Sequence, residues 1–155
     1  MNLNEPMSEH FSLRELVVTT HREFIGQQIE PPPAVLDALR ALCRTILEPI
    51  RQNFGAPLIV HSGYRCQRLN AVVGGSPRSQ HMLGEAADLH VAGFALPGVF
   101  SWIERESGLA YGQVILEPHD FPMWIHVSLG EPWRPFEDSR QAFKMDPKPA
   151  APVVA

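Results

Sequence analysis

An apolar stripe over residues 33–54 constrains the fold of this chain more than any other feature. Apolar side chains recur there every three or four positions, which is the spacing of one face of an α-helix. They are Val35, Leu36, Leu39, Leu42, Cys43, Ile46, Leu47 and Ile50. We expect a helix that begins after the prolines at 31–33 and stops at Gly55. Pro49 within the stripe predicts a kink or an early end.

The remaining elements are expected to be short, because the chain contains 15 prolines and proline interrupts regular structure. A second apolar stripe predicts a helix at 96–107, and a shorter helix is expected at 66–73. Apolar and alternating runs predict strands at 58–60, 86–91, 113–116 and 124–128. Helices followed by strands, with one helix inserted, indicate an α+β fold with a small antiparallel sheet flanked by helices.

The length of 155 residues is typical of one domain. We expect this domain to span residues 1–143. The Pro- and Ala-rich residues 144–155 are expected to form a disordered tail. Near the other end, residues 1–12 are expected to be mobile and residues 19–30 to form a loop.

The charge balance argues against two classes of partner. A net charge of −4 and a pI near 5.9 do not suit a nonspecific nucleic-acid binder or a polybasic membrane anchor. No apolar run reaches the roughly 18 residues of a membrane span, and residues 1–6 lack the features of a secretory signal. We expect no nucleic-acid partner, no membrane insertion and cytoplasmic synthesis without a Sec signal. Cys43 and Cys66 are expected to be ordinary reduced thiols.

A metal site is possible among the seven histidines. A chain that turns at Gly84 and enters a strand at Ala86 can bring His81 beside Asp88. Imidazole and carboxylate groups both bind Zn²⁺, and a catalytic zinc takes three protein ligands. His126 is the best third candidate, because strand alternation isolates it among bulky neighbours. The residues alone leave open that His126 is a hydrogen-bonded core residue and Asp88 a turn acceptor.

These residues belong to a longer pattern. Residues 79–88 have the form S-x-H-x-x-G-x-A-x-D, residues 62–65 are Ser-Gly-Tyr-Arg, and residues 124–128 are Trp-Ile-His-Val-Ser. In this order they resemble the M15 family of zinc peptidases, which includes D-alanyl-D-alanine carboxypeptidases and peptidoglycan endopeptidases of bacteria and phages. Residues 10–15 resemble its small phage and prophage subgroup. The resemblance covers residues 10–130 and implies a Hedgehog/DD-peptidase-like fold.

The resemblance also implies roles for individual residues. His81, Asp88 and His126 would be the ligands of a Zn²⁺ cofactor. Arg65 would bind a carboxylate or carbonyl of the substrate, for which its two parallel N–H donors are suited. Ser79 would orient its loop or contact the substrate. Without the resemblance, Arg65 and Ser79 would be interpreted as structural turn residues.

The general base is the point at which the chain departs from the family pattern. Many members carry an acidic residue two or three positions before the last zinc histidine, where this chain has Met123 and Trp124. Glu117, His119 and Asp120 are the nearby candidates. Glu117 is favoured because it resembles the Glu of the phage subgroup's Q-[LV]-I-x-E stretch, and His119 is second. The alternative is that all three are polar residues of a hairpin loop.

The resemblance implies a zinc-dependent peptidase that hydrolyses amide bonds in peptidoglycan stem or cross-link peptides, as a D,D-carboxypeptidase or an endopeptidase. We expect a monomer that acts on the cell wall, as a phage or prophage protein would without a Sec signal. One alternative is a non-catalytic, zinc-containing module of the same fold that binds the cell wall or forms part of a phage particle. A more remote alternative is a zinc-dependent amidase that acts on a small molecule.

Overall fold

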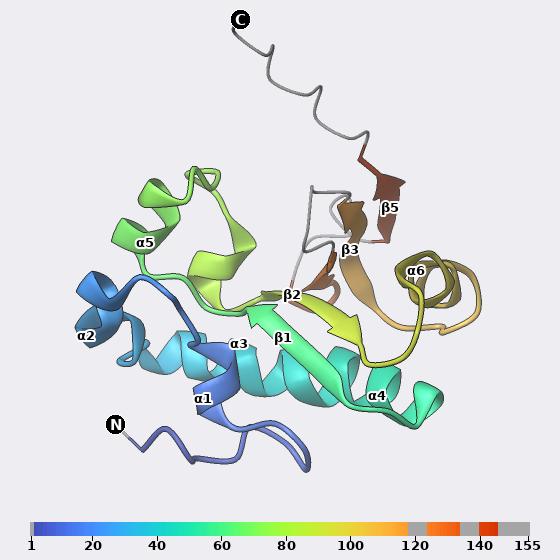
Figure 1. Ribbon diagram of the computed structural model, residues 1–155, viewed down its shortest axis with the longest axis horizontal. Helices are drawn as coiled ribbons and strands as arrows, with labels where there is room; N and C mark the ends of the chain where they lie inside the picture. The colour runs from blue at the N-terminus through green and yellow to red at the C-terminus, as the bar shows by residue number, and fades with distance from the viewer. Residues whose placement is uncertain (1, 118–123, 134–139, 146–155) are drawn as a thin grey trace, which may run out of the picture.

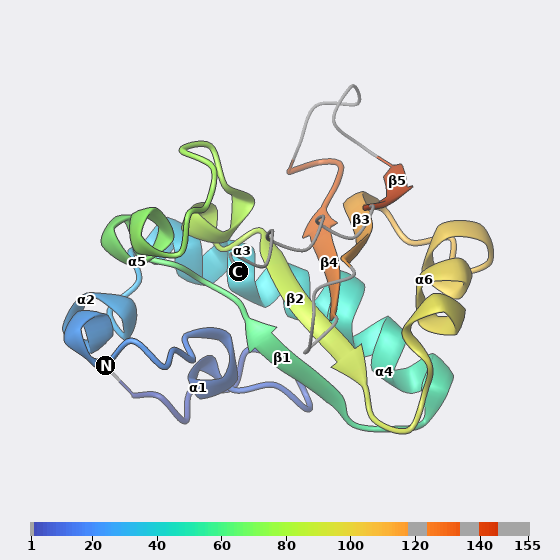
Figure 2. The ribbon, with the colours of Figure 1, turned by 45° about the horizontal axis from the view of Figure 1, so that its top comes forward.

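The computed structural model describes residues 2–117, 124–133 and 140–145. Its centre is a five-stranded sheet with the strand order β1-β2-β4-β3-β5 (Figures 1 and 2). The strands are β1 (Leu58–Ser62), β2 (Ala86–Val91), β3 (Tyr111–Glu117), β4 (Trp124–Leu129) and β5 (Gln141–Lys144). The first four pair antiparallel, whereas β5 pairs parallel with β3. The α+β fold is confirmed, but the sheet is mixed because a fifth strand follows the four that the sequence predicted.

One long helical rod packs against the sheet. It comprises α3 (Pro33–Leu42), the π-helical segment η2 (Cys43–Leu47) and α4 (Glu48–Phe54), so the helix expected over 33–54 is confirmed. Gly55 ends it in the left-handed conformation, with φ at 59°. The helix does not end early at Pro49. A wider π-helical turn lies directly before the proline, and it accommodates a residue that has no backbone N–H to donate.

The core lies between this rod and one face of the sheet. The stripe residues at the centre of the rod, such as Leu42 and Ile46, are fully buried. They share one apolar cluster with inward-facing strand residues such as Leu89, Ile125 and Val127. Helix α6 (Leu96–Arg105) packs chiefly against β3 (Figure 2).

The N-terminal segment is packed rather than mobile. Met7 is fully buried, Phe11 is 3% exposed, and Pro6 forms a β-bridge with Ser12. The short helix α1 (Leu13–Leu16) follows. The prediction of mobility was wrong because a few apolar side chains among polar ones are enough to anchor a segment once a core surface is available.

The predicted loop at 19–30 contains two helical turns, η1 (Arg22–Phe24) and α2 (Ile25–Gln28). They are too short to show a helical period in the sequence. The expected short helix is confirmed as α5 (Gln67–Val72), and a 3₁₀ turn, η3 (Gln80–Leu83), precedes β2.

At the C-terminal end, Lys144, the expected first residue of the tail, is the last residue of β5. Residues 146–155 lie outside the described residues. Within the described part of the chain, no helix combines the length and apolar character that crossing a membrane requires.

Gly84 is fixed by two independent constraints where η3 turns into β2. Its φ is 71°, in the left-handed region, and a Cβ there would lie 2.7 Å from the carbonyl oxygen of Val35 in α3. A side chain is therefore excluded both by the backbone conformation and by the helix behind it. Because Gly84 has no side chain, the end of the η3 turn can pack directly against α3.

We expect Gly84→Ala to destabilise the protein by about 2–5 kcal/mol, the sum of a left-handed backbone penalty and a steric clash. Gly55→Ala is the matched control, because Gly55 has a similar φ but nothing within 4 Å of its Cβ position. The control should cost only about 1–2 kcal/mol. Urea unfolding of both variants makes the comparison, and equal losses would show that the contact with α3 contributes nothing.

Glu48 anchors the N-terminal segment to the rod. The carboxylate is buried and accepts hydrogen bonds from Ser8 Oγ and the His10 backbone N–H, both at 2.7 Å. His10 Nδ1 lies 2.9 Å from its other oxygen. Burial raises the pKa of Glu48, but these hydrogen bonds outweigh burial and lower the pKa below its usual value.

We expect Glu48→Gln to destabilise the protein at pH 7 by about 1.5–3 kcal/mol, the range for hydrogen bonds to a charged group. A lowered folded-state pKa means that this stabilisation is present above the unfolded-state pKa and is lost as the pH falls through the folded-state value. The difference between wild type and variant should therefore shrink below about pH 4.5. Urea unfolding across that range measures it, and a difference that is constant with pH would contradict the assignment.

Candidate metal centre

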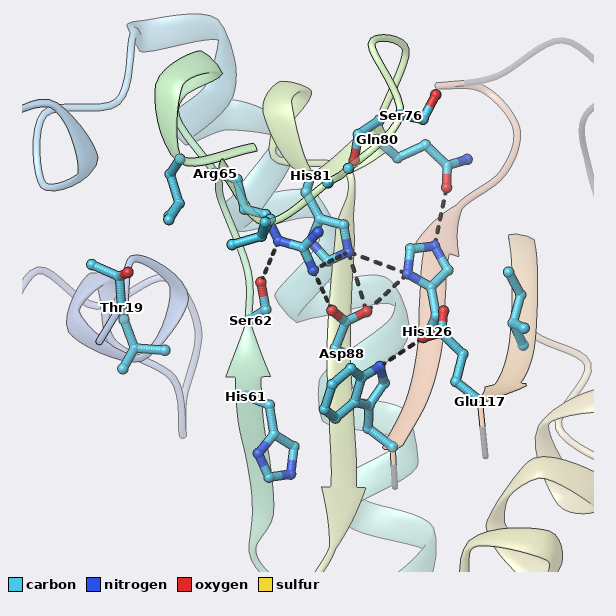
Figure 3. A pocket seen from close by; sticks show the side chains of 18 of the residues that line it. Thr19, His61, Ser62, Arg65, Ser76, Gln80, His81, Asp88, Glu117 and His126 are labelled. Atoms are coloured by element: carbon cyan, nitrogen blue, oxygen red, sulfur yellow. Dashed lines mark hydrogen bonds and ion pairs between the residues drawn. The ribbon is translucent and has the colours of Figure 1, made fainter. Parts of the chain in front are cut away.

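A cleft of about 1150 Å³ opens over the sheet. Its lining combines residues of β1 to β4 with the loop residues 18–21 and 73–79 (Figure 3). Arg65, Ser79 and Glu117, all predicted site residues, line this cleft together with the three predicted metal ligands. The other two base candidates, His119 and Asp120, lie outside the described residues.

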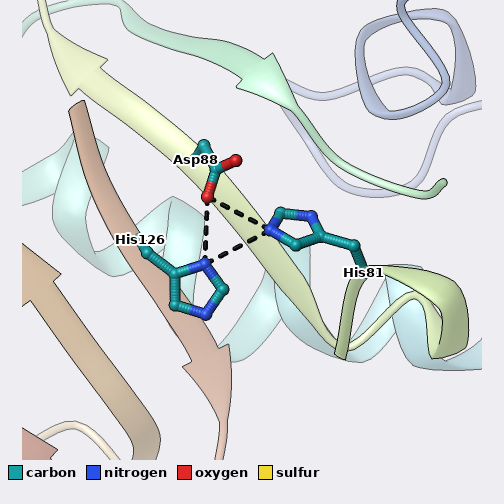
Figure 4. A group of neighbouring side chains, drawn as sticks. All are labelled: His81, Asp88 and His126. Carbon is teal, nitrogen blue, oxygen red and sulfur yellow. Dashed lines mark hydrogen bonds and ion pairs between the residues drawn. The ribbon is translucent and has the colours of Figure 1, made fainter. Parts of the chain in front are cut away.

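His81, Asp88 and His126 converge from three elements (Figure 4). His81 lies in η3, and Asp88 of β2 is the register partner of His126 in β4. All three are buried. His81 Nε2 and His126 Nδ1 lie 3.1 and 2.9 Å from Asp88 Oδ1, and 3.2 Å from each other. The structure thus brings together the ligand set that the sequence pointed to.

The surroundings of His81 fix its tautomer. Nδ1 lies 2.7 Å from the carbonyl oxygen of Gly63, which can only accept, so Nδ1 carries the hydrogen. On the other side, Nη2 of Arg65, which can only donate, lies 3.3 Å from Nε2. Nε2 of the neutral ring therefore presents its lone pair to the centre, which is the form of histidine that binds metals.

The donor set fits a zinc ion. A carboxylate and imidazole nitrogens face one another in a buried space, which is favourable only where positive charge lies between them. Burial raises the pKa of Asp88, but the neighbouring His81 and His126 lower it far below its usual range, so Asp88 is present as a carboxylate. Two imidazoles and one carboxylate match the three-ligand sets of catalytic zinc. Among the described residues, no other group of three His, Cys, Asp or Glu could hold a metal.

Arg65 contacts the centre directly. Its Nη2 donates to Asp88 Oδ2, and its Nε donates to Ser62 Oγ at 2.7 Å. Its backbone N–H donates to the carbonyl oxygen of His81 at 3.1 Å. Arg65 therefore orients a predicted ligand as well as lining the cleft, a role that its place in the sequence did not reveal.

Gln28 holds the turn that carries Arg65, and the sequence analysis missed it. The side chain is fully buried. Its amide donates to the carbonyl oxygen of Tyr64 and accepts from the Cys66 N–H at 2.9 Å. Gln28 lies 36 residues before Tyr64, in a segment expected to be a loop, so no local pattern could have linked it to the site.

Glu117 faces the cleft from the end of β3. It is the register partner of Trp124 in β4, whose indole Nε1 donates to Glu117 Oε2 at 3.0 Å. Trp124 and His126 are two positions apart on one strand and point to the same face. Glu117 thus lies on the neighbouring strand beside the metal centre. Trp124 also lines the cleft.

His61 extends this wall. Two residues of β1 face one of β2 between Val60 and Ser62, and this bulge turns His61 into the cleft. His61 Nε2 lies 2.7 Å from His90 Nδ1, and the His61 ring packs 6.0 Å from the Trp124 ring. Burial and the neighbouring His90 lower the pKa of His61, which favours the neutral ring.

Comparison with known proteins agrees with this geometry. Residues 9–128 match the family described as Peptidase M15. No curated protein matches the chain. The matched region spans more than half of the chain and contains the three converging side chains, Arg65 and Glu117. The chain therefore belongs to the peptidase M15 family and is a peptidase.

Proposed function

We propose that this peptidase is zinc-dependent and hydrolyses amide bonds in the stem or cross-link peptides of peptidoglycan, as a D,D-carboxypeptidase or an endopeptidase. The observation that carries the proposal is the convergence of His81 Nε2, Asp88 Oδ1 and His126 Nδ1, with no pair more than 3.2 Å apart. When bound, Zn²⁺ supplies a Lewis acid that polarises the scissile carbonyl and lowers the pKa of water.

Glu117 is the proposed general base. Hydrolysis requires a group that takes a proton from the attacking water as its oxygen bonds to the carbonyl carbon. The same group then gives that proton to the amide nitrogen as the C–N bond breaks. The carboxylate of Glu117 lines the cleft, and the Trp124 indole holds one of its oxygens. The Glu117 carboxylate is the proposed proton acceptor.

The substrate class is supported by the charge of the cleft wall. Arg65 and Arg78 line the cleft. Peptidoglycan stem peptides carry free carboxylates, and guanidinium groups form charge-assisted hydrogen bonds with carboxylates. Ser79, beside Arg78 in the same wall, is proposed to contact the peptide.

The biological setting is part of the same proposal. We propose that the protein is made in the cytoplasm, acts on the cell wall as a monomer and belongs to the phage and prophage subgroup. The resemblance of residues 10–15 to the phage and prophage subgroup supports this setting.

We expect the wild-type protein to bind one equivalent of Zn²⁺, and His81→Ala and Asp88→Ala to bind it at least about 100-fold more weakly, since changes outside the ligand set already cost 10–100-fold. Affinity should fall as the pH is lowered, because protons compete for the imidazole nitrogens. Competition with a chromophoric chelator measures both effects. His21→Ala, which changes a histidine on the rim of the cleft, is the control and should retain zinc. Failure of the wild type to bind zinc would remove the proposed metal centre.

We expect Glu117→Gln to keep its zinc and to lose at least about 100-fold in kcat, the lower end of what a general base contributes. The assay incubates zinc-loaded protein with purified peptidoglycan and quantifies new amine and carboxyl ends by mass spectrometry of the released peptides. The products also distinguish removal of a terminal D-alanine from cleavage of a cross-link. Zinc binding by the wild type without any released peptide would favour the non-catalytic module instead.

A further inference from the structure

Gln80 links the two histidines of the metal centre. It lies between Ser79 and His81 at the start of η3, and its side chain reaches across to β4, where Oε1 lies 3.2 Å from His126 Nε2 (Figure 3). His126 is 46 residues further along the chain. One 3₁₀ turn therefore carries one predicted ligand and contacts the outer nitrogen of another.

The contact has a chemical consequence for His126. A carbonyl oxygen can only accept, so a hydrogen bond to Gln80 Oε1 requires the hydrogen of a neutral ring to be on Nε2. The lone pair then lies on Nδ1, the nitrogen that faces His81 Nε2 and Asp88 Oδ1. Gly63 provides the equivalent acceptor for His81. Both rings would thus be held in the metal-binding tautomer by a carbonyl on the far side.

We infer that Gln80 is a positioning residue that holds the His126 ring in the tautomer and orientation that bind zinc. The inference rests on the proposed zinc function and adds a residue to it. Nothing else in the described part of the chain hydrogen-bonds His126 Nε2. The Gln80 backbone is itself fixed, since its carbonyl oxygen accepts from the Glu85 N–H at 3.1 Å. The side chain therefore starts from a defined point in the turn.

Two substitutions of Gln80 by side chains of similar length distinguish a hydrogen-bonding role from a steric one. Gln80→Met fills the same space but offers only a thioether sulfur, which is a weak acceptor. The ionised side chain of Gln80→Glu keeps strong acceptor oxygens and has no donor. We expect Gln80→Met to raise the zinc dissociation constant 10–100-fold, the range for groups that orient a metal ligand. Gln80→Glu should keep the wild-type affinity or tighten it. The half-buried side chain makes loss of folding unexpected, which thermal unfolding of the metal-free variants checks.

The added charge of Gln80→Glu needs its own control. Gln113 lines the same cleft, and its amide donates to Gln141. The double variant Gln80→Met with Gln113→Glu therefore adds the same charge to the cleft without an oxygen acceptor at position 80. Its affinity should stay as low as that of Gln80→Met alone.

Chelator competition with Zn²⁺ alone gives all four affinities, so the test does not depend on the substrate. Wild-type affinity in Gln80→Met would overturn the inference and leave the metal centre intact. Equal losses in Gln80→Met and Gln80→Glu, or recovery in the double variant, would also overturn it, because shape or charge would then explain the effect. A wild type that binds no zinc would overturn both this inference and the proposed function.

Discussion

The convergence of two imidazole nitrogens on one buried carboxylate is the constraint on which the rest of the site depends. Burying Asp88 beside lone-pair nitrogens is costly unless positive charge is supplied there. Arg65 supplies part of this charge by donating to the second oxygen of Asp88. The Gly63 carbonyl accepts from His81 Nδ1, so the lone pair of His81 Nε2 points toward Asp88. The three side chains form a buried group that could hold a metal ion.

Strand register places Asp88 beside His126, and the packing of short turns places His81 and Arg65 beside them. Asp88 and His126 meet because β2 and β4 pair antiparallel with these residues opposite each other. His81 comes from η3, which can lie against α3 only because residue 84 has no side chain. The Arg65 turn is bonded to His81 through both its backbone and its side chain. The site is therefore assembled from the whole domain rather than from one loop.

Glu117 occupies a place in the cleft close to where the family pattern has an acidic residue. Many related peptidases carry an acid two or three positions before the last histidine ligand, where this chain has Met123 and Trp124. Glu117 is the register partner of Trp124 and is hydrogen-bonded to its indole. A carboxylate on the neighbouring strand thus lies beside the place that the missing acid would occupy. The Trp124 ring, packed against His61, fills the wall and holds that carboxylate.

The sequence by itself determined what depends on local pattern: the helical rod over 33–54, the four antiparallel strands, and a His81–Asp88 pair brought together by the turn at Gly84. It did not predict β5 or α2, because four-residue elements carry too little periodicity to be recognised. Only the tertiary structure decided the contacts of Gln28 with the Arg65 turn and of Gln80 with His126, which span 36 to 46 residues. A polar side chain near a motif has no sequence signature for its partner, since that partner is selected by the distances and buried hydrogen-bonding needs of the folded chain.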